Sequence, residues 1–240
     1  HETGVARTAA GRLGRARRST PPRPRSGVGR PPLCLPLALR EDGRWHVRDF
    51  RTVPHELILG ATQSGKSVYL RNLLCGLARQ RVVLVGIDCK WGGVELAPFA
   101  PPRLSALADD PDYANELLDV LVEEMEARFR LIGLSGGTGP EATLTSDVWG
   151  GLPESVRPVP VVVVVDEVAE LFLAANKDDE KRRDAIVTKL IRLAQLGRAA
   201  GIYLEVCGQR FGSELGKGAT MLRAQLTGRV CHRVNDESSA

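Results

Sequence analysis

The fold of this chain is decided by the stretch GATQSGKS, residues 60–67. It fits the pattern G-x-x-x-x-G-K-[ST] at every fixed position, after a short predicted strand at 55–59 and before a run with helical periodicity. Glycines let such a loop wrap its backbone N–H groups around phosphate oxygens, and the following helix adds its positive end. The stretch therefore predicts a site for a nucleoside triphosphate, with Lys66 on the β- and γ-phosphates and the Ser67 hydroxyl on Mg²⁺.

A second pair of candidate residues follows the strongest apolar run in the chain. Five valines at 161–165 predict a strand buried on both faces, and Asp166 and Glu167 come directly after it. We expect Asp166 to hold Mg²⁺ through water and Glu167 to be the general base that positions the attacking water. The alternative is that both acids cap the next helix. The residues expected to bind the nucleotide are Gly60, Ala61, Thr62, Gln63, Ser64, Gly65, Lys66, Ser67, Val68 and Asp166.

Polar residues also end two other predicted strands. Gln209 follows the strand at 202–207, and its amide is placed to sense the γ-phosphate or to orient water. The alternative is an amide that makes only a strand-end hydrogen bond. The tripeptide Asp88-Cys89-Lys90 ends the strand at 82–88 on the same edge, and either joins the site or merely ends the strand.

Strands and helices alternate along the rest of the chain. Residues 35–39 and 45–50 flank the polar turn 41–44 and predict a β-hairpin. The other expected strands are 55–59, 82–88, 161–165, 202–207 and 229–234, and the expected helices are 66–79, 111–132, 177–200 and 220–226. Residues 133–158 are rich in glycine, proline and serine and predict a loop. The alternation predicts an α/β fold with a mostly parallel central sheet flanked by helices.

The composition is ordinary for a globular protein, with 43% hydrophobic and 26% charged residues. The formal net charge of +4 comes from residues 1–32, which hold eight arginines and one acid, so the remaining chain is slightly acidic. No stretch reaches the roughly 20 apolar residues of a membrane span. We therefore expect a cytoplasmic protein, associated with a membrane only through segments outside this chain. Five cysteines without a C-x-x-C pair predict buried, reduced thiols.

Several motifs occur in an order that resembles one family. After the loop at 60–67 come Asp88-Cys89-Lys90, EMEARF at 124–129, Val165-Asp166-Glu167, RAAGI at 198–202 and Gly208-Gln209-Arg210. This order is similar to the motor domain of the FtsK/SpoIIIE DNA translocases, and the similarity covers roughly residues 33–240. Two further stretches, VRDFRTVPHE at 47–56 and GKGATMLR at 216–223, resemble the actinobacterial TraB-type conjugation proteins.

The resemblance implies a RecA-like P-loop fold, a homo-hexameric ring and ATP-driven movement of double-stranded DNA through its channel. It assigns the γ-phosphate sensor to Gln209, and to Arg229 the arginine that acts on the neighbouring subunit's nucleotide, with Arg223 as a rival. It also implies channel loops in the glycine-rich stretch after Arg130 and at 217–223. In the family's pattern the core continues further, so we expect the ATPase domain at 33–240 to be truncated at its C-terminal end.

Other readings of the same residues stay open. An FtsK-like ATPase module of a type VII protein secretion system would share these motifs, although such modules usually occur in tandem and this chain holds one P-loop motif. A degenerate ring element that binds nucleotide without hydrolysis would not need the intact Lys66, Asp166 and Glu167. Residues 1–32 are expected to be a disordered arm or an added linker, and a basic arm can contact DNA phosphates or anionic lipid.

Overall fold

The computed structural model of this chain describes residues 33–100, 103–134, 149–216 and 218–234. The expected arm at 1–32 and the chain end at 235–240 lie outside the described residues. So do residues 135–148 and Lys217, which belong to the two expected channel loops. None of the helices within the described ranges is long and apolar enough to cross a membrane.

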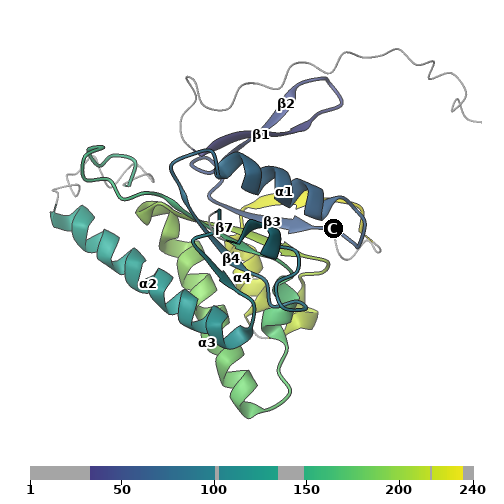
Figure 1. Cartoon of the computed structure of the whole chain (residues 1–240). Helices are drawn as coiled ribbons and strands as arrows, with labels where there is room; N and C mark the ends of the chain where they lie inside the picture. Colours follow the sequence, from purple (N-terminus) through teal and green to yellow (C-terminus); the bar gives the residue numbers. More distant parts are fainter. Residues whose placement is uncertain (1–32, 101–102, 135–148, 217, 235–240) are drawn as a thin grey trace, which may run out of the picture.

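The centre of the protein is a parallel sheet (Figure 1). Its strands lie in the order β5-β4-β6-β7-β3-β8. They are β3 (His55–Leu59), β4 (Val83–Ile87), β5 (Ala106–Ala108), β6 (Val161–Val165), β7 (Ile202–Gly208) and β8 (Gly228–Cys231). The order places β7 between β3, which leads into residues 60–67, and β6, which leads into Asp166.

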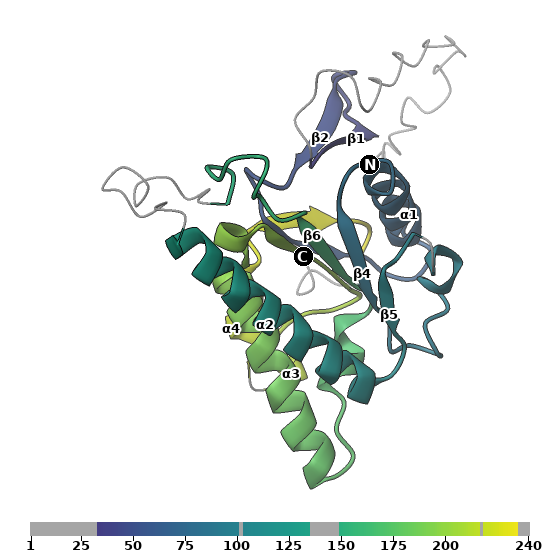
Figure 2. The same ribbon diagram turned by 60° about the vertical axis from the view of Figure 1, so that its left-hand side comes forward.

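Helices cover both faces of this sheet (Figure 2). They are α1 (Lys66–Leu77) on one face, and α2 (Pro111–Leu134), α3 (Lys177–Leu196) and α4 (Ala219–Gln225) on the other. The valines of β6 show why both faces must be covered, because successive side chains of a strand point to opposite sides. Val163 is fully buried in the core with α2, α3 and α4, whereas Val164 is fully buried in the core with α1. The result is a three-layer α/β fold.

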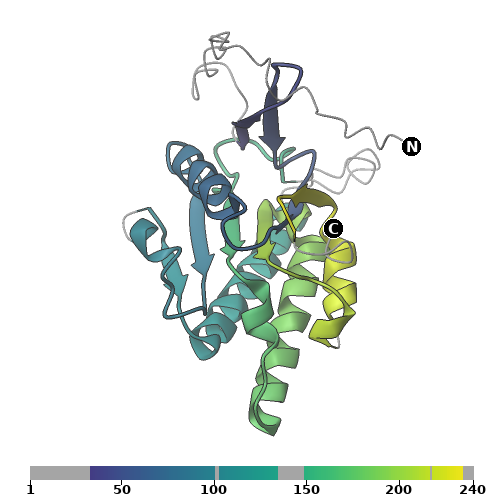
Figure 3. The same cartoon turned by 90° about the vertical axis from the view of Figure 1, so that its right-hand side faces the viewer.

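An N-terminal hairpin stands apart from the central sheet (Figure 3). Its strands, β1 (Cys34–Leu39) and β2 (Trp45–Asp49), pair in antiparallel fashion across a turn in which Gly43 has φ 81°. The hairpin packs on α1 through Leu35. A Cβ added at Gly76 of α1 would lie 2.8 Å from the Leu35 side chain, so the glycine provides the space for this contact.

Buried charges tie the hairpin to the sheet. The register of β3 and β7 puts Glu56 beside Glu205, and both carboxylates are almost inaccessible to solvent. Arg48 of β2, also buried, places its Nε 2.9 Å from Oε1 of Glu205 and 3.3 Å from Oε1 of Glu56. The Tyr69 hydroxyl of α1 donates a further hydrogen bond of 3.0 Å to Glu56. Burial raises the pKa of Glu205 to about 8, although Arg48 opposes the shift.

The predicted fold class is confirmed, and the predicted strands and helices are found within a few residues of their expected bounds. Four short elements were not predicted: β5 and the 3₁₀ helices η1 (Ala97–Phe99), η3 (Val168–Phe172) and η5 (Ser213–Leu215). The expected helix 177–200 changes to the 3₁₀ helix η4 (Gly197–Ala200) after Leu196 and stops at Gly201, whose φ is 69°. The prediction of buried thiols is wrong for Cys75 and Cys231, which lie on the outer side of α1 and on an edge strand and are exposed.

Candidate functional site

Parallel strands bring the candidate residues to one edge of the sheet. Because β3, β4, β6 and β7 run in the same direction, their carboxyl ends meet there. β3 leads into residues 60–67, the P-loop, and β6 into Asp166 and Glu167. Gln209 follows β7, so it lies between the P-loop and Asp166. This topology assembles a site from segments that are far apart in the sequence.

The P-loop is held by backbone hydrogen bonds that it donates to the end of β7 and to the segment after β8. The Gly60 amide donates to the Gly208 carbonyl at 3.1 Å, and the Ala61 amide donates to the Arg233 carbonyl at 2.9 Å. Gly65, with φ 100°, turns the chain into α1. The first N–H groups of a helix have no partner within the helix, so those of α1 are available to an anion.

His232 lies beneath the P-loop and, together with Ser64, leaves no room for a side chain at Gly60. A Cβ added at Gly60 would overlap the Ser64 Oγ and lie 2.9 Å from the His232 Cβ. The His232 amide donates to the Leu59 carbonyl at 2.8 Å, and its ring makes an edge contact with Tyr69. Burial lowers the pKa of His232, and Lys66 lowers it further. His232 was not predicted to belong to the site, because its position under the loop depends on the pairing of β3 with β8.

Lys66 and the two acids after β6 form one cluster. The Lys66 Nζ lies 3.4 Å from Oδ1 of Asp166 and 3.6 Å from Oε2 of Glu167. Burial alone would lower the pKa of Lys66, but the two carboxylates raise it overall, so the ammonium stays charged. The fold thus brings the P-loop lysine and the two acids that follow β6 together in one ion-pair cluster.

The carboxylate of Glu167 is not used to cap the helix that follows it. Glu167 adopts a left-handed backbone conformation, φ 49°, ahead of η3, and makes no side-chain capping bond. Its Oε1 instead accepts a hydrogen bond of 3.2 Å from the Gln209 backbone amide. Of the two explanations for this acid, the geometry favours a role in the site over helix capping.

A cavity of about 780 Å³ opens over the P-loop. Its walls include most of the predicted residues, but Ser64 and Glu167 are not among them. The lining residues are Gly60, Ala61, Thr62, Gln63, Gly65, Lys66, Ser67, Val68, Arg71, Asp88, Lys90, Trp91, Val94, Glu95, Asp166 and Gln209. Three of these are exposed apolar side chains: Val68, Trp91 and Val94. The volume is within the range of small-molecule sites.

Asp88 organises the wall that follows β4. Its carboxylate is fully buried and accepts backbone hydrogen bonds from Lys90 at 3.3 Å, Glu95 at 3.0 Å and Leu96 at 3.1 Å. Burial raises the pKa of Asp88, and the nearby Asp166 adds to the shift. Asp88 therefore fixes residues 90–96 against the cavity, a role that the sequence left open. The contributions of Arg71, Trp91 and Val94 were missed, because only the fold brings them to the P-loop.

Arg229 lies away from this cavity. It is exposed on the edge strand β8, and its guanidinium donates to the backbone carbonyls of Gly228 at 2.9 Å and Arg223 at 2.8 Å. The rival residue, Arg223, donates to the Phe211 carbonyl at 3.0 Å. Neither arginine lines the cavity of its own chain, which is the arrangement that a residue acting on a neighbouring subunit requires.

The donor set of the cavity suits Mg²⁺ bound together with phosphate. Mg²⁺ commonly uses one or two protein oxygens, several waters and the phosphates of its substrate. Ser67 supplies a hydroxyl and Asp166 a carboxylate at the cavity wall. Within the described residues, no group of three or more His, Cys, Asp or Glu side chains forms a complete metal cage. The residues present therefore fit a metal that arrives with the nucleotide.

Comparisons with known proteins agree with this geometry. A transfer protein of Streptomyces ambofaciens, TraSA, is 66% identical over 212 residues, covering 87% of this chain and 50% of the relative. The DNA translocase SftA of Bacillus subtilis is 34% identical over 216 residues, covering 86% of this chain and 21% of the relative. The chain thus spans half or less of these relatives' lengths.

A solved structure has the same fold and a related sequence. The conjugation coupling protein TcpA of pCW3, in a monomer form with ATPγS, superimposes with a TM-score of 0.69 and 28% identity. The match covers 82% of this chain and 53% of that one. The sequence model of the FtsK/SpoIIIE family matches residues 28–213, which include the P-loop, Asp166 and Gln209. Together with the cavity and its cluster of Lys66, Asp166 and Glu167, this match shows that the chain belongs to the FtsK/SpoIIIE family.

Proposed function

We propose that this chain is the motor domain of a DNA-transfer protein, which hydrolyses ATP with Mg²⁺ and uses the energy to move double-stranded DNA. The observation that carries the proposal is the ion-pair cluster of Lys66, Asp166 and Glu167, of which Lys66 and Asp166 line a cavity built on a P-loop. The kinship with a transfer protein and a DNA translocase supports DNA as the cargo. A type VII secretion module, the second expectation, has no comparable support from these relatives.

Nucleotide binding changes the partners of Lys66. In the described structure its ammonium is paired with Asp166 and Glu167. The β- and γ-phosphates would attract that ammonium, since the P-loop directs them to the start of α1. Glu167 would then lose its cationic neighbour and be free to accept a proton. Lys66 thus couples the arrival of ATP to the readiness of the catalytic carboxylate.

The reaction is an in-line displacement at the γ-phosphorus. A water oxygen forms the new bond, the bond from the γ-phosphorus to the bridging oxygen breaks, and ADP leaves. Glu167 takes the proton of the water. Ser67 and, through water, Asp166 would hold Mg²⁺, which would supply positive charge beside the phosphates. The hydrogen bond from the Gln209 backbone amide to the Glu167 carboxylate fixes the base in position.

Gln209 also connects the phosphate site to α4, which adjoins the segment expected to face the DNA channel. Its backbone holds Glu167, and it lines the cavity. Two residues later, the Phe211 carbonyl accepts a hydrogen bond from Arg223 of α4. A change at the γ-phosphate would therefore reach α4 and the adjoining segment expected to face the channel. We include the ring in the proposal: a neighbouring subunit would supply Arg229, since no cation of β8 lines the cavity within the described residues.

The test is ATP hydrolysis with and without duplex DNA, over a range of protein concentrations. We expect DNA to stimulate hydrolysis, and a concentration threshold to appear if a ring must assemble. Stimulation should fall steeply with salt and depend little on sequence, because DNA would be held by its phosphates. The matched control is Glu167→Gln, which should bind ATP and not hydrolyse it. Stimulation by a secreted peptide and not by DNA would replace the DNA proposal with the secretion module.

A further inference from the structure

Lys90 is attached to a backbone that is fixed at the cavity wall. Its amide donates to Oδ1 of Asp88, and its carbonyl accepts from the Gly93 amide at 3.1 Å. Gly93 has φ 79°, a conformation that glycine adopts without strain. The Gly93 carbonyl in turn accepts from the Ala97 amide at 2.7 Å, at the start of η1. The attachment point of the Lys90 side chain is therefore organised before any ligand binds.

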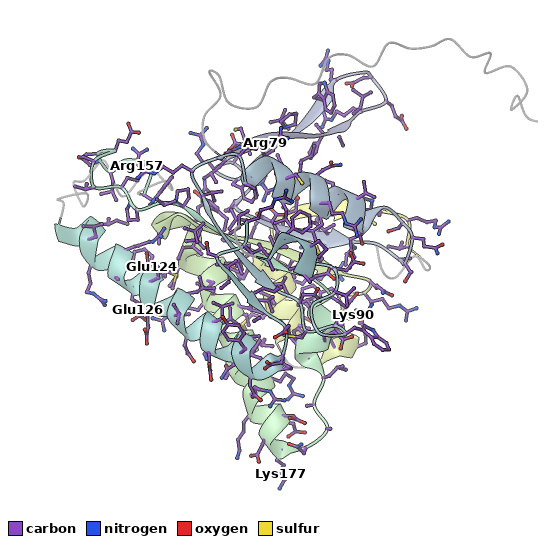
Figure 4. The ribbon with its side chains drawn as sticks, viewed as in Figure 1. Arg79, Lys90, Glu124, Glu126, Arg157 and Lys177 are labelled. Atoms are coloured by element: carbon purple, nitrogen blue, oxygen red, sulfur yellow. The ribbon has the colours of Figure 1, made fainter. Side chains whose placement is uncertain are left out.

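The cations of the cavity wall differ in their partners. Lys66 is paired with Asp166 and Glu167, and Arg71 is paired with Glu95 at 3.6 Å. Lys90 is half-buried and lines the same cavity, yet among the described residues no ion pair or side-chain hydrogen bond holds its ammonium. Figure 4 shows it beyond the end of β4, on the loop that Asp88 organises. A half-buried cation with no acidic partner is suited to an anionic ligand.

The local charge favours such a role. Three carboxylates, those of Asp88, Glu95 and Asp166, line the cavity, against two cations other than Lys90, those of Lys66 and Arg71. A triphosphate would meet an excess of negative charge without another cation. Lys90 supplies the additional positive charge from the same chain, and an ammonium group binds phosphate oxygens as a point charge.

The strand order indicates which phosphate Lys90 would meet. The P-loop directs a triphosphate with its nearest phosphates at the start of α1 and its far end toward Lys66 and Asp166. β4 lies on the side of β6 that faces away from the P-loop strand β3. Lys90, after β4, is therefore farther from the P-loop along the sheet edge than Asp166, after β6. We propose that Lys90 binds the terminal phosphate of the nucleotide, opposite Lys66, and makes the cavity select a nucleoside triphosphate over a diphosphate. This role rests on the proposed function, because it requires ATP in the cavity.

The experiment measures the dissociation constants of ATPγS and ADP, each with Mg²⁺, by titration calorimetry. Lys90→Met should weaken ATPγS binding roughly ten-fold or more, because a charge-assisted hydrogen bond is lost. ADP binding should change little, since ADP lacks the terminal phosphate. Lys90→Arg should keep most of the selectivity. Lys177→Met, which removes an exposed lysine at the start of α3, is the matched control and should alter neither constant (Figure 4).

The outcomes separate the two proposals. If the wild-type chain binds neither nucleotide, or if Lys66→Ala binds both as tightly as wild type, the ATP site itself is wrong. If the wild type binds both and Lys90→Met weakens them equally, or not at all, the role of Lys90 is overturned and the ATP site stands. Thermal unfolding without nucleotide should give the same midpoint for Lys90→Met and wild type, because no partner in the described structure depends on this ammonium.

Discussion

The Nε of Arg48 donates a hydrogen bond of 2.9 Å to Glu205, although 157 positions separate the two residues. Glu56 lies beside Glu205, so the single cation of Arg48 faces two adjacent buried carboxyl groups. Arg48→Met would leave them without a cation, and breaking a buried pair by removing one partner costs about 3–5 kcal/mol. We expect a loss of that order in the free energy of unfolding, measured by urea titration.

The matched control for Arg48 is another arginine of the same hairpin. Arg44 pairs with Asp42 at 3.9 Å, and its side chain is 83% exposed. Arg44→Met should therefore change the free energy of unfolding by less than about 1 kcal/mol. Equal effects of the two substitutions would show that the buried network adds nothing beyond a surface ion pair.

The same network predicts an alkaline loss of stability. The pKa of Glu205 rises from 4.5 to about 8 on folding, so between these values the folded state holds a proton that the unfolded state releases. Its contribution to stability is full below 4.5 and is lost as the pH rises to 8. Buried His55 acts oppositely, since burial lowers its pKa from 6.5 to about 3, and this offsets the trend below pH 6.5.

The measurement therefore compares the free energy of unfolding at pH values of about 6.5 and 8. It should fall across this interval, by no more than about 1.4 kcal/mol per pH unit. Glu205→Gln keeps the shape of the protonated side chain and should flatten the slope. A slope that persists in Glu205→Gln would assign the titration to another group.

The sequence predicts what depends on local pattern and misses what depends on pairing. The P-loop, the valine strand and Asp166 are local, and they were located without a structure. Glu205 was not predicted to matter, although a lone carboxylate inside an apolar strand needs a partner and so offered a signal. Its partner Arg48 could not be named, since only the packing of the hairpin on the sheet brings it there.

Very short or irregular segments are also difficult to predict from the sequence. β5 has three residues, Ala106–Ala108, too short for an alternating pattern to be recognised. The cavity wall at residues 90–95 has no periodicity and is ordered by the buried carboxylate of Asp88. For the same reason Trp91 and Val94 could not be assigned to the site beforehand.

Gly201 should tolerate no side chain. It has φ 69°, and an added Cβ would lie 2.7 Å from the ring of Trp149. Gly201→Ala is therefore expected to lower the free energy of unfolding by about 2 kcal/mol or more, from backbone strain and overlap together. Gly133→Ala on α2 is the control, because a Cβ there meets nothing within 4 Å. It should leave stability unchanged or raise it by about 0.5 kcal/mol.

Trp91 should report nucleotide binding. Its side chain is 84% exposed at the cavity, whereas Trp149 is 4% exposed. A nucleotide in the cavity would shield Trp91 from water, so its emission should shift and iodide should quench it less. Trp91→Phe should abolish the change on adding ATPγS, while Trp45→Phe should keep it. An unchanged signal in Trp91→Phe would mean that bound nucleotide does not approach this wall.

A mixing experiment tests whether Arg229 acts on a neighbouring subunit. Lys66→Ala removes the P-loop ammonium, and Arg229→Ala removes a guanidinium that lies outside its own cavity. Each variant alone should be inactive in DNA-stimulated hydrolysis. In an equal mixture, about one site in four would join an intact P-loop to an intact Arg229 from the next subunit, so roughly a quarter of the activity should return.

The control mixture contains no intact P-loop. It combines Lys66→Ala with the double variant Lys66→Ala/Arg229→Ala and should stay inactive at every ratio. If the first mixture also stays inactive, Arg229 does not act across the interface. Repeating it with Arg223→Ala then decides whether the rival residue does, because Arg223 contacts the Phe211 carbonyl in its own chain and its loss should also disturb α4. Recovery with one arginine variant and not with the other would assign the trans-acting residue.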